Sequence, residues 1–104
     1  MEDNKRTRIV IGCPVETETR ELVSANILEV EVGTTGHCGG DTGHGCRTFF
    51  RLKNLSSTDM RVDVVEDIDD TTDEVSISFG GDTELDTFLD ALTFAVEKLR
   101  GYVK

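Results

Sequence analysis

Apolar and polar residues alternate with a period of two along four stretches of the chain. These stretches are Glu21–Val32, Thr48–Leu55, Met60–Val64 and Val75–Phe79. In the later part of the first stretch, leucine and valine alternate with Glu29 and Glu31, so one face is apolar and the other is charged. Because successive side chains of a β-strand point to opposite sides, this pattern is typical of strands with one buried face. Turn-forming residues separate the stretches, and the sequence therefore predicts a mostly antiparallel sheet of four or five strands.

The charges on two of these segments indicate which strands are neighbours. Arg51 and Lys53 occupy the polar face of one segment, and Glu29 and Glu31 occupy the polar face of another. Opposite charges on facing strands stabilise a pair by about 0.2–1 kcal/mol and help to set the register. We therefore expect the two segments to pair, with the two basic residues opposite the two glutamates.

The N-terminal part of the chain gives a weaker pattern. Arg8–Ile11 is a short apolar run that Gly12 ends, and it fits either a strand or a buried arm. Residues 1–7 are polar, and we expect them to form a loose tail. The chain of 104 residues has the length of a single domain.

A helix is expected from residue 82 to residue 101, directly after the last strand. Apolar residues in this segment recur every three or four positions and form one stripe. They are Leu85, Phe88, Leu89, Leu92, Val96 and Leu99. Asp82 is a residue type that favours an N-cap, and Gly101 is one that favours a helix C-terminus. Since the apolar face of the sheet needs a cover, the predicted fold is α+β, with this helix packed across one face.

Two phenylalanines do not fit this arrangement. Phe94 lies about 180° from Leu85 on the helical wheel, and Phe49 falls on the charged face of its strand. A single exposed apolar residue is normal in a small protein. Two of them favour a subunit contact, and we predict that Phe49 and Phe94 lie in the interface of a homo-oligomer.

The charge of the chain is strongly negative and unevenly distributed. The net charge is −10, and between Asn54 and Asp90 twelve acidic residues accompany a single base, Arg61. Such a surface repels phosphate backbones and anionic lipids, which argues against direct binding to nucleic acid or to a membrane. It would attract a basic protein partner. No apolar stretch is long enough to span a bilayer, the odd number of cysteines argues against a closed disulfide framework, and we expect a cytoplasmic protein.

The stretch GTTGHCGGDTGHGC, from Gly33 to Cys46, connects two of the predicted strands and is rich in glycine. Glycine lets a backbone approach a ligand closely and point successive N–H groups at it. The candidate residues for binding a small anionic ligand are Thr34, Thr35, Gly39, Gly40, Asp41, Thr42, Gly43, His44 and Arg47. The alternative is an architectural turn in which glycine supplies positive φ angles. Because many glycines are costly to order, we expect something to pack on this loop: a ligand, a neighbouring subunit or the first arm of the chain.

Other chemistry has less support in the spacing of these residues. Cys38, His44 and Cys46 are the candidates for a metal ion, but structural zinc sites use pairs of ligands about two to four residues apart, repeated twice. Asp41 and His44 could form an acid–base pair with Thr42 or Cys46 as the nucleophile. A single helix on a single sheet, however, offers little concavity for a substrate. We expect no resident cofactor.

The sequence thus predicts a non-enzymatic, cytoplasmic binding module that forms a homo-oligomer. Residues 33–47 would be its recognition element for a small polar or anionic ligand or for a neighbouring subunit. The alternative is an acidic inhibitor, of the class found in phages and mobile elements, that binds the basic surface of a nucleic-acid enzyme through residues 54–90. A small metal-dependent or acid–base enzyme is the third hypothesis.

Overall fold

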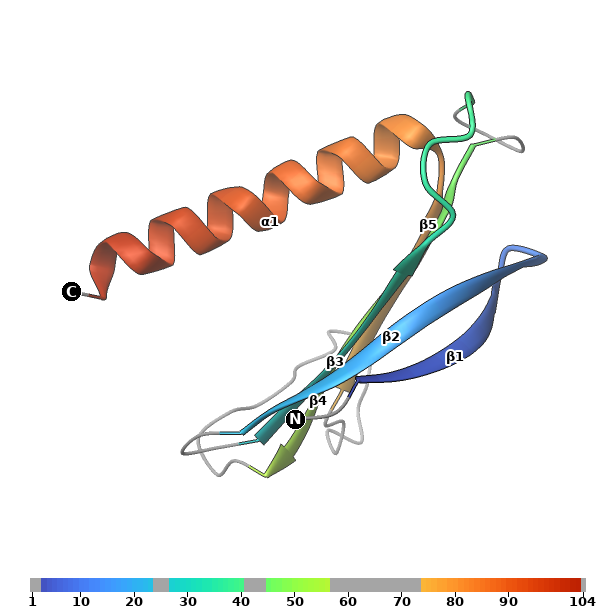
Figure 1. The fold of residues 1–104 in the computed structure, drawn as a ribbon. Coiled ribbons are helices and arrows are strands. Elements are labelled where there is room, and N and C mark those ends of the chain that lie inside the picture. Colours follow the sequence, from blue (N-terminus) through green and yellow to red (C-terminus); the bar gives the residue numbers. More distant parts are fainter. Residues whose placement is uncertain (1–2, 24–26, 41–44, 57–73, 104) are drawn as a thin grey trace, which may run out of the picture.

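The computed structural model contains one five-stranded sheet followed by one helix (Figure 1). It describes residues 3–23, 27–40, 45–56 and 74–103. The elements are β1 (Asp3–Val10), β2 (Cys13–Val23), β3 (Ile27–Thr34), β4 (Arg47–Ser56), β5 (Glu74–Gly80) and α1 (Asp82–Tyr102). Consecutive strands pair antiparallel, so their order across the sheet is their order along the chain. The predicted α+β class, with an antiparallel sheet and a C-terminal helix, is confirmed; the expected strand at residues 60–64 lies outside the described residues.

The N-terminal residues differ from the expectation of a loose tail. Residues 3–10 form β1, which pairs along its whole length with β2. Ile11 and Gly12 make the connecting turn with φ angles of 49° and 79°, and a two-residue hairpin turn of this hand requires positive values at both positions. The sequence hides this hairpin because the buried positions of β2 include Thr17 and Thr19, which alternate with exposed charged residues. Both faces of this strand therefore carry polar residues, and the sequence pattern does not show which face is buried.

The charged face of the central strands is the better buried face of the sheet. The strands curl so that β1 comes close to β4 and β5, with which it does not pair. Glu31 and Thr17 on this face are completely buried, and Thr19 and Arg51 are nearly so. The predicted register is confirmed, because Glu31 of β3 lies opposite Arg51 of β4. The face that the sequence marks as solvent-exposed is thus enclosed by the N-terminal hairpin.

Glu31 is the centre of an ion-pair network on this enclosed face. Its carboxylate accepts hydrogen bonds from Nε and Nη2 of Arg8, both at 2.7 Å, and from the hydroxyl of Thr17 at 2.6 Å. Nη1 of Arg51 adds a contact at 3.3 Å and also donates to Glu29 at 2.8 Å. The hydrogen bonds from Arg8, followed by that from Thr17, lower the pKa of Glu31 to about 2 although burial opposes this shift. Charged groups, rather than a large apolar core, hold this side of the sheet together.

The apolar face of the sheet is covered by α1 only where the helix begins. Leu85 is buried, and the ring of Phe88 packs edge-on against Phe50 and Phe79, with centroid distances of 5.6 and 5.1 Å. After these first two turns the helix diverges from the sheet (Figure 1), and every residue from 89 to 103 is exposed. The stripe that was expected to lie across the sheet does so at its start, and its later residues do not contribute to a core.

Gly33 permits the close approach of β2 and β3 on which the curl depends. A Cβ atom at this position would meet the backbone oxygen of Glu16 and would lie 2.7 Å from the side chain of Thr17. Since the backbone of β2 is held by pairing on both sides, Gly33→Ala is expected to lower the free energy of unfolding by about 1–3 kcal/mol in urea titration. Gly101→Ala is the control, because a Cβ there meets nothing within 4 Å. Equal stability of the two variants would contradict this role of Gly33.

Candidate functional site

The glycine-rich loop between β3 and β4 is fastened to the start of α1. The carboxylate of Asp82 accepts hydrogen bonds from the backbone N–H groups of Cys38 at 3.0 Å, Gly39 at 2.7 Å and Cys46 at 3.0 Å. In return, the N–H of Asp82 donates to the carbonyl oxygen of Gly40 at 2.9 Å. We call this set of contacts the Asp82 clamp. The sequence led us to expect that something packs on this loop, and in the structure the first turn of α1 does so.

Asp82 is therefore not the N-cap that its residue type suggests. The N-cap is Gly81, with φ of 116° and no side-chain capping bond, and Asp82 is the first helical residue. The hydrogen bond from the N–H of Cys38, followed by those from Gly39 and Cys46, lowers the pKa of Asp82 to about 2. The carboxylate is thus charged at neutral pH. The backbone amides of the loop were predicted to bind an anionic ligand. In the structure, three of them bind the carboxylate of Asp82.

The predicted ligand-binding residues that the structure describes also make internal contacts. The hydroxyl of Thr34 lies 3.0 Å from that of Thr48, and the hydroxyl of Thr35 accepts a hydrogen bond from the N–H of Arg47 at 2.9 Å. The side chain of Arg47 is buried, and its Nη1 donates to the carbonyl oxygens of Gly45 and Cys46 at 3.0 and 3.2 Å. These contacts close the base of the loop. Asp41, Thr42, Gly43 and His44 lie outside the described residues.

The cysteines and His37 have separate partners. Cys46 is buried and its Sγ donates to the carbonyl oxygen of Gly81 at 3.1 Å, whereas Cys38 is exposed. Nε2 of His37 lies 2.8 Å from the carboxylate of Asp86 and adds a second tether between loop and helix. All three cysteines of the chain are free thiols. Within the described ranges, no three His, Cys, Asp or Glu side chains gather as metal ligands, and His44 falls outside those ranges.

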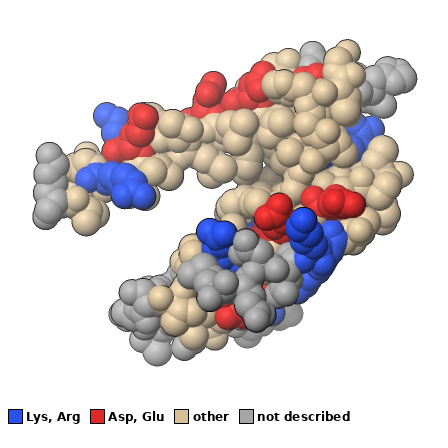
Figure 2. Space-filling model, viewed as in Figure 1, with Lys and Arg blue, Asp and Glu red and all other residues tan. Residues whose placement is uncertain are grey.

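The divergence of α1 from the sheet leaves an open apolar cleft. One pocket of about 280 Å³ lies between the first half of the helix and the sheet, and we call it the helix–sheet cleft. It is lined by Val32, Gly33, Thr34, Thr48, Phe49, Phe50, Leu85, Phe88, Leu89 and Leu92. Figure 2 shows this notch between the two lobes of the molecule, with uncharged residues on the underside of the helix. From the sequence, Thr34 and Phe49 of this lining were predicted as binding or interface residues, and Leu85, Phe88, Leu89 and Leu92 were predicted only as the apolar stripe of the helix.

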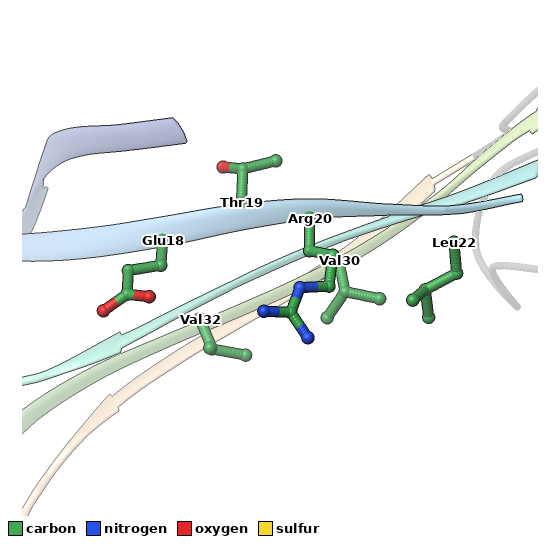
Figure 3. Close-up of a pocket in the computed structure, with 6 residues that line it drawn as sticks. All are labelled: Glu18, Thr19, Arg20, Leu22, Val30 and Val32. Carbon is green, nitrogen blue, oxygen red and sulfur yellow. The ribbon is translucent and has the colours of Figure 1, made fainter. Parts of the chain in front are cut away.

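The floor of the cleft continues along the sheet beyond Val32. A second hollow of about 290 Å³ shares Val32 with the cleft and extends past Val30 to Leu22, and Glu18 and Arg20 line it opposite Val32 and Val30. Figure 3 shows these side chains on one side of the sheet, while Thr19 points to the other side. The helix wall continues as well, because a third hollow begins at Leu92 and includes Val96 and Arg100. The apolar surface is therefore continuous along both the sheet and the helix.

The two phenylalanines predicted to form an interface have different surroundings. Phe49 is half-buried, and the guanidinium of Arg8 lies over its ring at 5.0 Å. Through this contact with Arg8, Phe49 packs on the enclosed face of the sheet. Phe94 is 62% exposed, and Lys98 lies over its ring at 5.8 Å. Their role in a subunit contact stays a prediction.

Part of the acidic region has internal partners. Nε of Arg51 donates to Glu74 at 2.9 Å, which lowers the pKa of Glu74. Asp82 and Asp86 bind the glycine-rich loop, as described above. The acidic residues between positions 57 and 73 of the region 54–90 lie outside the described residues. At least three carboxylates that an acidic inhibitor could present to its target are therefore used within the chain.

Comparison of the chain with protein-family models, with curated proteins and with solved structures finds no match. Within the described ranges, no helix is both long enough and apolar enough to cross a membrane.

Proposed function

We propose that the protein is a non-enzymatic association module that receives an amphipathic helix in the helix–sheet cleft. The observation that carries this proposal is the continuous apolar surface that runs from Leu22 across Val32 and Phe50 to Leu92. A contiguous apolar patch of a few hundred Å² on a small protein is often a site of association with another protein. A groove walled by a helix and floored by a sheet suits an apolar helix face with side chains three or four positions apart.

The glycine-rich loop has a supporting part in this proposal. Its described amides bind Asp82, so its contribution is to fix the direction in which α1 leaves the sheet. With this direction fixed, the cleft stays open. The hypotheses of a small anionic ligand and of a cytoplasmic location stay predictions from the sequence.

A synthetic peptide with the sequence of residues 82–103 is a suitable probe of the cleft, because it carries an amphipathic stripe. The peptide in large excess is expected to shift the NMR signals of the backbone amides of Val32, Phe50 and Leu92 in the full chain. A matched peptide with Leu89→Glu and Leu92→Glu is the control and is expected to shift none of them. If the native peptide leaves these amides unchanged, or if the two peptides act alike, the proposed function is wrong.

A further inference from the structure

We infer that the helix received by the cleft is α1 of a second copy of this chain, in a two-fold dimer in which each copy's helix covers the other's sheet. This inference rests on the proposed function and names its partner. The cleft is incomplete without the second copy, because that copy supplies the missing wall. The two helices would run antiparallel across the dimer axis, and both contacts would be identical.

The chain's own helix is held away from the surface that it would have to cover. The Asp82 clamp fixes the first turn of α1 to the loop, and the contact of His37 with Asp86 fixes the second turn. Backbone bonding between Gly81 and Cys46, with an N···O distance of 2.8 Å, fixes the junction with β5. A helix held by these bonds points away from its own sheet after its first turns (Figure 1). The helix of another copy has no such restraint relative to this sheet.

The surfaces that remain open within one copy are complementary to each other. The sheet exposes Leu22, Val32 and Ile77, which belong to one face by their register in β2, β3 and β5. The helix exposes a stripe formed by Leu89, Leu92, Val96 and Leu99. One two-fold contact would cover both surfaces, and neither would remain exposed.

Charged residues that border these surfaces also match. Glu18 lies opposite Val32 on the neighbouring strand of the sheet floor, and Arg100 lies on the part of the helix wall beyond Leu92. These opposite charges could meet at the rim of the contact, where such pairs favour one orientation over others. The rim therefore supports the same pairing of helix with sheet as the apolar surfaces do.

The exposed apolar area is close to what a small dimer needs. The seven side chains of the two surfaces are between 36% and 65% exposed. At roughly 100 Å² of apolar surface for a whole aliphatic side chain, they offer about 330 Å² per copy and about 650 Å² per dimer. A specific protein–protein interface at the lower limit of about 1,200 Å² contains roughly 700–800 Å² of apolar surface. The two areas are similar, so we expect a dimer that dissociates on dilution.

Sedimentation of the full chain from about 1 µM to about 1 mM is the experiment that tests this inference. The native chain is expected to form a dimer, and Leu92→Glu, which places a charge in the cleft, is expected to raise its dissociation constant about 100-fold or more. Phe94→Glu is the matched control, because it adds the same charge on the opposite face of the same helix and should leave the dimer intact. Circular dichroism establishes that each variant keeps its fold.

Two further measurements test whether the dimer is formed by the exchanged helices. Each copy carries a net charge of −10, so raising the salt from about 0.1 M to about 1 M is expected to strengthen the dimer, whereas binding of an acidic inhibitor to a basic target would weaken. In mixtures of labelled and unlabelled chain, isotope-filtered NOEs are expected between Leu92 or Val96 of one copy and Val32 or Phe50 of the other.

The possible results separate this inference from the proposed function. A monomer throughout the concentration range, together with binding of the 82–103 peptide, would overturn the helix exchange and leave the association module in place. A monomer that also ignores the peptide would overturn both. A dimer that survives Leu92→Glu but is lost with Phe94→Glu would place the interface on the face predicted from the sequence and would overturn the exchange.

Discussion

Replacing Glu31 with glutamine is expected to lower the free energy of unfolding at pH 7 by about 3 kcal/mol. The carboxylate is completely buried and receives two hydrogen bonds from Arg8 and one from Thr17. A glutamine has the same shape, but it leaves the guanidinium groups of Arg8 and Arg51 beside a neutral amide. The substitution is costly because Arg8 loses its carboxylate partner and the buried Arg51 keeps only Glu29 and Glu74 of its three carboxylate partners. Urea titration followed by circular dichroism measures the loss.

Glu16→Gln is the control for this substitution. Glu16 lies on β2, is exposed and points away from the enclosed face, since its neighbours Val15 and Thr17 are buried. Surface substitutions of this kind usually change stability by less than about 0.5 kcal/mol. If both variants lost the same stability, the network around Glu31 would not be the cause.

The pH dependence gives a second readout of Glu31. Its pKa in the folded chain is about 2, below the ordinary value of 4.5. A carboxylate whose pKa falls on folding contributes stability that is complete above pH 4.5 and is lost as the pH approaches 2. That shift corresponds to a contribution of about 3 kcal/mol. Stability of the native chain should fall across this window, and Glu31→Gln should lack this component of the fall.

The sequence predicts the central strands well because their register depends on neighbouring charges. The pairing of Glu29 with Lys53 and of Glu31 with Arg51 needs only the alternation of two segments and the signs of four residues. What the sequence does not reveal is which face is enclosed. That depends on β1, whose Arg8 reaches Glu31 across two strand pairings. Local patterns carry no information about such a curl.

The candidate site was less predictable, for a related reason. The loop binds Asp82 through the N–H groups of Cys38, Gly39 and Cys46, and every residue except proline carries such a donor. No side-chain pattern marks an amide as a partner. The stripe of α1 could be recognised in the sequence, but the contacts of the clamp, which we propose set the direction of the helix, could not. The open cleft at Leu92 therefore could not be inferred from periodicity alone.

Asp82→Ala is expected to release the loop and, with it, the direction of α1. The substitution removes the acceptor of three backbone N–H groups, so amide hydrogen exchange at Cys38, Gly39 and Cys46 should become about tenfold faster or more. Once the helix is no longer held by the clamp, it can lie on its own sheet. Sedimentation should then show that the dimer formed by helix exchange shifts toward a monomer, although no residue that lines the cleft has changed.

Glu84→Ala is the control for the clamp, because Glu84 is an exposed acid in the same first turn of the helix. It removes a similar charge near the helix N-terminus and should leave both exchange and sedimentation unchanged. Acid should mimic Asp82→Ala in the native chain: the folded pKa of Asp82 is about 2, below the ordinary 3.8, so the clamp is complete above pH 3.8 and is lost toward pH 2. Unchanged protection of the three amides in Asp82→Ala would show that the loop is held by other contacts. Faster exchange with an unchanged dimer would show that the clamp orders the loop without determining where the helix lies.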